Sequence, residues 1–98
     1  MQNGKYVISI KRIKNYSGEN LKPEDQYYQY AGYDIHSGSM STGYPIFLDE
    51  CKALRFKTVD DAKNWWKVNS KDMLNNQNCY DYNTLVIREV VYRTVDCL

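Results

Sequence analysis

A single strong helix signal, in a chain whose other periodic segments read as strands, is the feature that most constrains the fold. Thr58 is a good helix N-cap, and Asp61 follows three residues later, as in a capping box. Asp60 and Asp61 also suit the positive end of a helix dipole. Apolar residues then recur at spacings of three and four, at Val59, Ala62, Trp65 and Trp66. The pattern predicts one amphipathic helix from Thr58 to about Asn69, with Ser70 capping a short second turn.

The first periodic segment predicts a strand. In Lys5–Ile13, apolar side chains occupy every second position, at Tyr6, Ile8 and Ile10. Lys5, Ser9 and Lys11 alternate with them, so we expect one apolar face and one mostly wet face. The residues that follow, Lys14–Asp25, are rich in Asn, Ser, Gly and Pro and predict a polar loop.

The second predicted strand, Gln26–Ile35, has aromatic residues on both faces. Its alternation places Tyr28 and Tyr30 on one side, and on the other side Tyr27, Ala31, Tyr33 and Ile35. Either both faces are covered in the fold, or one set of tyrosines is exposed for use.

The remaining extended segments are shorter or less regular. Pro45–Leu48 predicts a third strand, which Lys52–Phe56 continues after a bend. Asn75–Asn83 is polar and predicts a loop. Thr84–Val95 is rich in β-branched residues and predicts the strongest strand, with a bulge at Arg88–Glu89 where the alternation fails.

These segments predict an α+β fold in the order β-β-β-α-β. We expect an antiparallel sheet of about four strands with one helix packed on one face. A chain of 98 residues is the size of one domain, so residues 1–98 are predicted to form a single domain.

Composition excludes two classes of surface. Thirteen basic and twelve acidic residues leave a net charge of about +1, which is neither a basic nucleic-acid surface nor an acidic mimic of DNA. The first residues lack the apolar core of a signal peptide, and no apolar run approaches the roughly 20 residues that cross a bilayer. We therefore expect a cytoplasmic protein with no membrane contact.

The segment from Gln26 to Tyr44 holds five of the ten tyrosines, mixed with Gly, Ser and Thr. Tyrosine supplies a large, stiff contact area with a polar tip, and this mixture is typical of binding surfaces. The alternative is that these tyrosines are half-buried in the sheet, because tyrosine also favours strands. Trp66 lies beside the apolar stripe of the helix, where it either packs at the boundary of the core or contacts a partner. The predicted partner-binding residues are Tyr28, Tyr30, His36, Met40, Tyr44 and Trp66.

No catalytic set is recognisable, and we expect a protein that is not an enzyme. The single histidine, His36, could act as a base, but no motif joins it to the nearest candidate nucleophile, Cys51. Asp60 and Asp61 are explained by helix capping. The glycines do not form a phosphate-binding loop.

A zinc site is an alternative for the cysteines, although no cofactor is the leading prediction. Cys51, Cys79, Cys97 and His36 match a Cys3His ligand set. None of them forms a C-x-x-C pair, and a straight strand would hold Cys79 and Cys97 about 40 Å apart. An odd number of cysteines also predicts reduced thiols.

Nucleic acid is the second predicted partner. Lys63, Lys67 and Lys71 repeat every four residues and line one side of the helix. With exposed tyrosines beside them, such lysines could hold phosphates while the rings stack on bases. The alternative is a solvated helix face, with Asp60 placed to pair with Lys63.

Phe56, Thr58 and Ala62 form an F-x-T-x-x-x-A pattern at the start of the helix. With this pattern beside a tyrosine-rich antiparallel sheet, the chain resembles small accessory proteins of phages and prophages in Gram-positive bacteria. Among these are anti-CRISPR inhibitors, compact binders that occupy a nuclease surface. The resemblance implies an inhibitor of a host defence nuclease, such as a CRISPR effector, acting in the host bacterial cytoplasm. Many such inhibitors are acidic DNA mimics, and this chain is not acidic, so it would act by blocking a protein domain.

Overall fold

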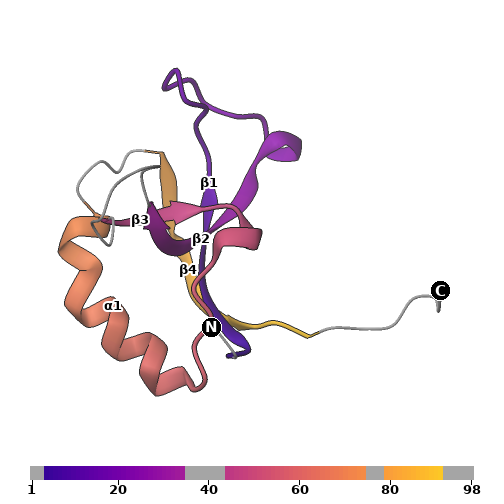
Figure 1. Cartoon of the computed structure of the whole chain (residues 1–98). Helices are drawn as coiled ribbons and strands as arrows, with labels where there is room; N and C mark the ends of the chain where they lie inside the picture. Colours follow the sequence, from indigo (N-terminus) through magenta and orange to yellow (C-terminus); the bar gives the residue numbers. More distant parts are fainter. Residues whose placement is uncertain (1–3, 35–43, 75–78, 92–98) are drawn as a thin grey trace.

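The computed structural model describes residues 4–34, 44–74 and 79–91. Within these residues, four strands form one antiparallel sheet in the order β3-β2-β1-β4, and one helix packs on one of its faces (Figure 1). The predicted α+β architecture is therefore confirmed. The elements are β1 (Tyr6–Arg12), η1 (Pro23–Asp25), β2 (Tyr27–Asp34), β3 (Tyr44–Leu48), η2 (Glu50–Lys52), α1 (Val59–Met73) and β4 (Tyr80–Glu89).

The core lies between the sheet and the helix. It is centred on β1, the strand that pairs with β2 on one side and β4 on the other. Its buried members come from three strands, the helix and the segment before the helix: Ile8, Ile10, Ala31, Phe47, Phe56, Ala62 and Met73. The other face of β1 is buried at Val7 and Ser9 and half-buried at Lys11. The prediction of a mostly wet face is wrong at Ser9, whose hydroxyl accepts a hydrogen bond from Arg88 Nε at 2.8 Å.

The helix begins where the sequence predicts and ends later. The Asp61 N–H donates to Thr58 Oγ1 at 3.0 Å, which confirms Thr58 as the N-cap. The prediction of an end near Asn69 is wrong, because the helix continues without a break to Met73. Met73 is buried in the core, and this burial favours the extra turn over a separate turn capped by Ser70.

The strand β4 begins earlier than predicted. Tyr80–Asn83 belongs to the strand, which corrects the predicted loop over Asn75–Asn83. Tyr80 and Tyr82 pack against the core, and the Tyr80 hydroxyl donates to Gln29 Oε1 at 2.7 Å. The same Tyr80 oxygen accepts from the buried Arg12 guanidinium at 3.1 Å. Tertiary contacts therefore outweigh the local preference of this polar segment for a loop.

The irregularity in β4 also lies elsewhere than predicted. Arg88 and Glu89 pair regularly with β1, so the predicted bulge at these residues is wrong. The register shifts instead between the pairs Ser9–Val86 and Lys11–Asp81. Thr84 stabilises the shift, because its Oγ1 accepts the Lys11 N–H at 2.8 Å and donates to the Asp81 carbonyl at 2.6 Å.

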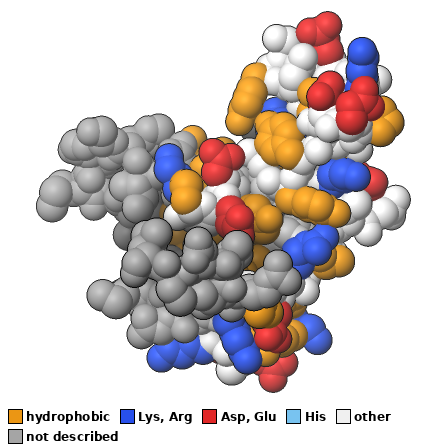
Figure 2. Space-filling view, turned by 90° about the vertical axis from the view of Figure 1, so that its right-hand side faces the viewer, with side chains coloured by type: hydrophobic (Ala, Val, Ile, Leu, Met, Phe, Trp, Pro, Cys, Tyr) orange, Lys and Arg blue, Asp and Glu red, His pale blue; other side chains and the backbone are white. Residues whose placement is uncertain are grey.

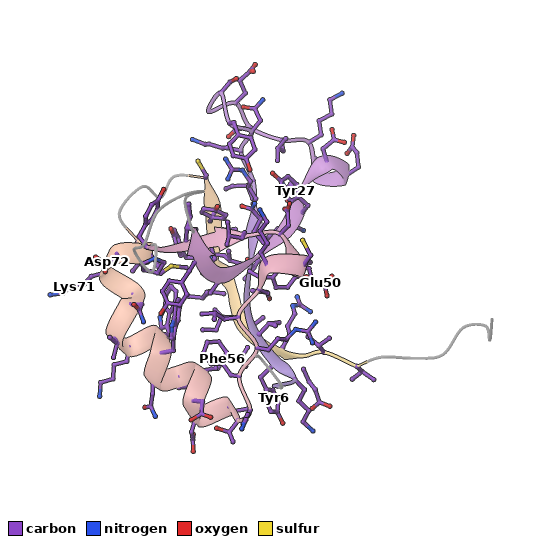
Figure 3. The ribbon with its side chains drawn as sticks, in the orientation of Figure 1. Tyr6, Tyr27, Glu50, Phe56, Lys71 and Asp72 are labelled. Carbon is purple, nitrogen blue, oxygen red and sulfur yellow. The ribbon has the colours of Figure 1, made fainter. Side chains whose placement is uncertain are left out.

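The chain after η2 lies against β1 and β2 and does not continue β3 as predicted. The Leu54 N–H donates to the Ala31 carbonyl at 2.9 Å, and Tyr6 and Phe56 exchange two backbone hydrogen bonds. Figure 3 shows Tyr6 and Phe56 next to each other at one end of the sheet. The approach requires two glycines: a Cβ at Gly32 would lie 2.7 Å from the Lys52 carbonyl oxygen, and one at Gly4 would clash with the Phe56 backbone.

Within residues 4–34, 44–74 and 79–91, no helix combines the length and the hydropathy needed to cross a membrane.

Candidate interaction surface

Alternation along β2 separates its four tyrosines onto the two faces of the sheet. Tyr33 points to the helix side, where its hydroxyl accepts a hydrogen bond from Trp65 Nε1 at 2.9 Å. Tyr27 shares that face, whereas Tyr28 and Tyr30 lie on the opposite face. Tyr27 and Tyr28 are almost equally exposed, at 38% and 40%. The two neighbours therefore offer similar areas to solvent on opposite sides of the molecule.

Two basic side chains hold the ring of Tyr28. The Arg88 guanidinium lies 4.5 Å from the ring centroid, and the Lys11 ammonium lies 6.0 Å from it. Arg88 is fixed in turn by its hydrogen bond to Ser9. These cation–π contacts restrict the side chains while the ring remains partly exposed.

Tyr30 and Tyr44 extend this surface along the sheet. Their strands pair at Tyr30–Leu48 and Asp34–Tyr44, a register that places both tyrosines on the face away from α1. Tyr30 is half-buried, and its burial raises the pKa of its hydroxyl; nearby Glu50 also raises this pKa, and Arg88 lowers it. We call this surface the tyrosine face, composed of Lys11, Tyr28, Tyr30, Tyr44 and Arg88.

The side of the molecule away from the helix is mixed in character. Figure 2 shows this side, where side chains of the hydrophobic class, which in this view includes tyrosine, lie among Lys, Arg, Asp and Glu side chains over the part drawn in colour. Glu50 lies on η2 at this side (Figure 3). The surface therefore combines aromatic area with charges of both signs.

The predicted partner-binding residues do not all lie together. Tyr28, Tyr30 and Tyr44 share the tyrosine face, and His36 and Met40 lie outside the described residues. Trp66 lies on the other side of the sheet, with its ring 6.2 Å from that of Phe47. Sequence reasoning missed Lys11 and Arg88 as members of the tyrosine face. Alternation in β1 and β4 would place each of them on one face. The strand order that sets β1 between β2 and β4, and so brings both side chains to the Tyr28 ring, has no local signal.

Trp66 lines an apolar groove between α1 and β4. The groove has a volume of about 330 Å³, and Lys63 is its charged member. Its other lining residues are Ile8, Leu85, Val86 and Ile87. Trp66 is partly buried at the boundary of the core, which is one of the two positions that the sequence predicted for it.

The helix lysines and the tyrosine face do not form one surface. Lys63, Lys67 and Lys71 are exposed on α1, which covers the opposite face of the sheet from Tyr28. Figure 3 shows Lys71 near the C-terminal end of the helix, where its side chain points outward, away from the sheet. A nucleic acid that contacts the lysine row would not reach Tyr28 or Tyr30 across the sheet.

The cysteines form no site within the described residues. Cys51 is exposed on η2, and Cys79 is half-buried just before β4; both are free thiols. His36 and Cys97 lie outside the described ranges, and within those ranges no three His, Cys, Asp or Glu side chains gather as metal ligands would. The zinc hypothesis stays a prediction, which elemental analysis of the untagged protein tests.

The fold and this surface define a small α+β protein with an aromatic and basic sheet face. No protein-family model matches the chain, and no characterised protein or solved structure matches it either.

Proposed function

We propose that this protein is a non-enzymatic protein-binding module whose contact surface is the tyrosine face. The observation that carries the proposal is the placement of the Tyr28 ring, partly exposed yet held by Arg88 and Lys11. Tyrosine and arginine are among the residue types enriched where binding energy concentrates at protein interfaces. A protein surface is therefore the partner that this chemistry fits best.

Restriction of the side chains before binding supports the proposal. An interface side chain that becomes fixed on binding costs about 0.5–1.5 kcal/mol in lost freedom. The contact to Tyr28 and the hydrogen bond to Ser9 already restrict Arg88 in the free protein. Much of the side-chain freedom of Arg88 is therefore lost when the protein folds, so less is lost when it binds a partner.

The mixed charge of the surface favours a protein over a nucleic acid. Glu50 lies close enough to Tyr30 to affect its pKa, opposite in sign to Arg88. A carboxylate at this position would repel a phosphate backbone. The resemblance to phage accessory proteins makes a host defence nuclease, such as a CRISPR effector, the first partner to test, with the module blocking one of its protein surfaces in the bacterial cytoplasm.

The test uses two adjacent tyrosines as a matched pair. The protein and its Tyr28→Ala and Tyr27→Ala variants are used as bait in a bacterial lysate, and captured proteins are identified by mass spectrometry. Tyr28→Ala should abolish capture, whereas Tyr27→Ala, with similar exposure on the other face, should retain it. Circular dichroism verifies that both variants fold. Capture of no protein, or equal loss with both variants, contradicts the proposal.

A second function has one observation in its favour. Lys11 and Arg88 flank an exposed aromatic ring, an arrangement that also suits stacking of a base between phosphate contacts. Binding of this kind weakens steeply as salt rises. A gel-shift assay at two salt concentrations tests it, and the absence of salt-dependent binding to single-stranded DNA or RNA removes it.

A further inference from the structure

The strand β4 is an edge strand of the described sheet, because β1 is its neighbour on one side and no described strand pairs with the other. An edge strand presents unpaired backbone donors and acceptors to any second strand that approaches. The edge lies on the opposite side of β1 from β2 and β3, which carry most of the tyrosine face. Pairing along the backbone edge of β4 is a different contact from the aromatic contacts of the proposed function, and Arg88 is the member of the tyrosine face that lies on this strand.

The ladder with β1 shows which backbone groups of β4 are open. The Val90 N–H donates to the Lys5 carbonyl at 2.6 Å. In an antiparallel ladder every second residue directs its backbone groups to the same neighbour, so Arg88 and Val86 also bond to β1. Ile87 and Glu89 therefore direct their N–H and C=O groups away from β1, toward the open edge.

The groove beside this edge is apolar except for one positive charge. Leu85 and Ile87 line it together with Trp66, and Lys63 reaches it from the helix. Lys63 and Glu89 are both exposed, and within the described chain neither has an ion-pair partner. In particular, Lys63 does not form the ion pair with Asp60 that helix spacing would allow. A negative charge placed beside the groove would satisfy Lys63.

We propose that β4 pairs with β4 of a second copy of this chain, antiparallel and centred on Ile87. In this register Ile87 meets Ile87 of the second copy, a pair whose backbone groups both face the open edge. Glu89 of the second copy then lies opposite Leu85, on the face that carries the groove and Lys63. The two-fold axis repeats this contact, so each Lys63 acquires a carboxylate.

Other centres of pairing fit less well. Pairing centred on Arg88 places two arginines opposite each other, and pairing centred on Glu89 does the same with two glutamates; like charges in this position are destabilising. Pairing centred on Val86 places Glu89 of one copy opposite Asn83 of the other, beyond the groove. Asn83 lies in the part of β4 where the register with β1 is irregular. Only the Ile87 centre satisfies both the open backbone groups and the charge of Lys63.

A charge exchange tests the register. The mass in solution is measured by sedimentation over a concentration series, and we expect a monomer–dimer equilibrium. Lys63→Glu and Glu89→Lys alone should each raise the dimer Kd by at least about tenfold, because each places like charges together. The double variant should return the Kd to within about threefold of the original protein. Lys67→Glu, one turn further along α1 and outside the groove lining, is the control and should leave the Kd within about threefold of the original.

Hydrogen exchange gives a second readout at single residues. Raising the protein concentration should slow exchange at the Ile87 and Glu89 amides, while the Val86 and Arg88 amides are already protected in the monomer. A monomer at every concentration overturns the proposal, as does a dimer that neither single variant weakens or that the double variant fails to restore. Capture of a different protein by this edge in a monomeric chain also overturns it.

Discussion

Tyr27 and Tyr28 show how one step along a strand changes the environment of a residue. They are adjacent, chemically identical and almost equally exposed, yet the tyrosine face includes only Tyr28. The difference comes from β1 and β4, which bring Lys11 and Arg88 to the Tyr28 ring. The property of the residue is therefore set by strands distant in sequence.

Glycine substitutions should report on the close approach of the chain after η2. Gly32→Ala places a methyl group 2.7 Å from the Lys52 carbonyl oxygen and 3.1 Å from a Leu48 side-chain carbon, so the backbone must move. We expect a loss of about 1–3 kcal/mol in the free energy of unfolding, as for overpacked cores. Urea denaturation measures the change.

Gly18→Ala is the control for that substitution. Gly18 has a φ of +84°, and its Cβ would meet no atom within 4 Å. The cost is then only the backbone strain of about 1–2 kcal/mol, and Gly18→Asn should reduce it because asparagine tolerates this conformation. Unchanged stability in Gly32→Ala would show that the chain after η2 does not lie against β2 as described.

Single residues were predictable where a local rule acts and unpredictable where a distant partner decides. The sequence correctly placed Tyr28 and Tyr30 on the opposite face from Tyr27, because alternation is a local property. It did not reveal that Ser9 is buried, because Arg88 is 79 residues away. Pairing between distant strands has no signature in either strand alone.

At the scale of elements, α1 is the best-predicted part of the molecule. Its start is fixed by a side-chain hydrogen bond between residues three apart, which the sequence displays directly. Its end depends on the burial of Met73, a property of the assembled core. The start of a capped helix is therefore easier to predict from sequence than a helix end that depends on packing in the core.

Removal of the cap should destabilise the protein measurably. Thr58→Ala leaves the Asp61 N–H without its acceptor and should lower the free energy of unfolding by about 1 kcal/mol. Thr58→Ser keeps the hydroxyl and should stay close to the original value. Thermal unfolding followed by circular dichroism measures both variants, and equal stability of all three proteins would contradict the role of Thr58.

The strand β4 shows the limit of composition as a guide. Tyr80 and Tyr82 lie in a segment of Asn, Asp and Gln that predicts a loop, yet they pack on the core. Arg12 and Gln29 supply hydrogen-bond partners for the Tyr80 hydroxyl, which allows a polar residue to be half-buried there. Only part of the tyrosine face could be predicted, for the same reason. Alternation within a strand indicates which face each tyrosine occupies, but the positions of Lys11 and Arg88 beside Tyr28 depend on the order of the strands in the sheet.

At the scale of the whole molecule, partly buried tyrosines link stability to alkaline pH. Burial raises the pKa of Tyr82 to about 12, and it also raises the pKa values of Tyr27, Tyr30 and Tyr80. In the unfolded chain a tyrosine ionises near pH 10. Between about pH 10 and pH 12 the unfolded state releases these protons first, so stability present below pH 10 is lost as pH rises.

The Tyr82→Phe variant tests this link. Its free energy of unfolding should fall less steeply above about pH 10 than that of the original protein, because one titrating group has been removed. Urea denaturation at several alkaline pH values measures the two slopes. Tyr16→Phe, at a tyrosine that is 83% exposed, is the control. Identical slopes for the original protein and Tyr82→Phe would contradict the assignment.

The central place of β1 has a consequence for how the chain acquires its structure during synthesis. One neighbour of β1 follows it closely in sequence, but the other, β4, is far away, with Ser9 and Arg88 separated by 79 residues. During synthesis, β1 can therefore pair with β4 only after β4 has left the ribosome. Strands that are far apart in sequence pair slowly, and until β4 pairs with it the free edge of β1 is prone to aggregation. The central position of β1 thus affects both the rate of folding and the time during which the chain is most prone to aggregate.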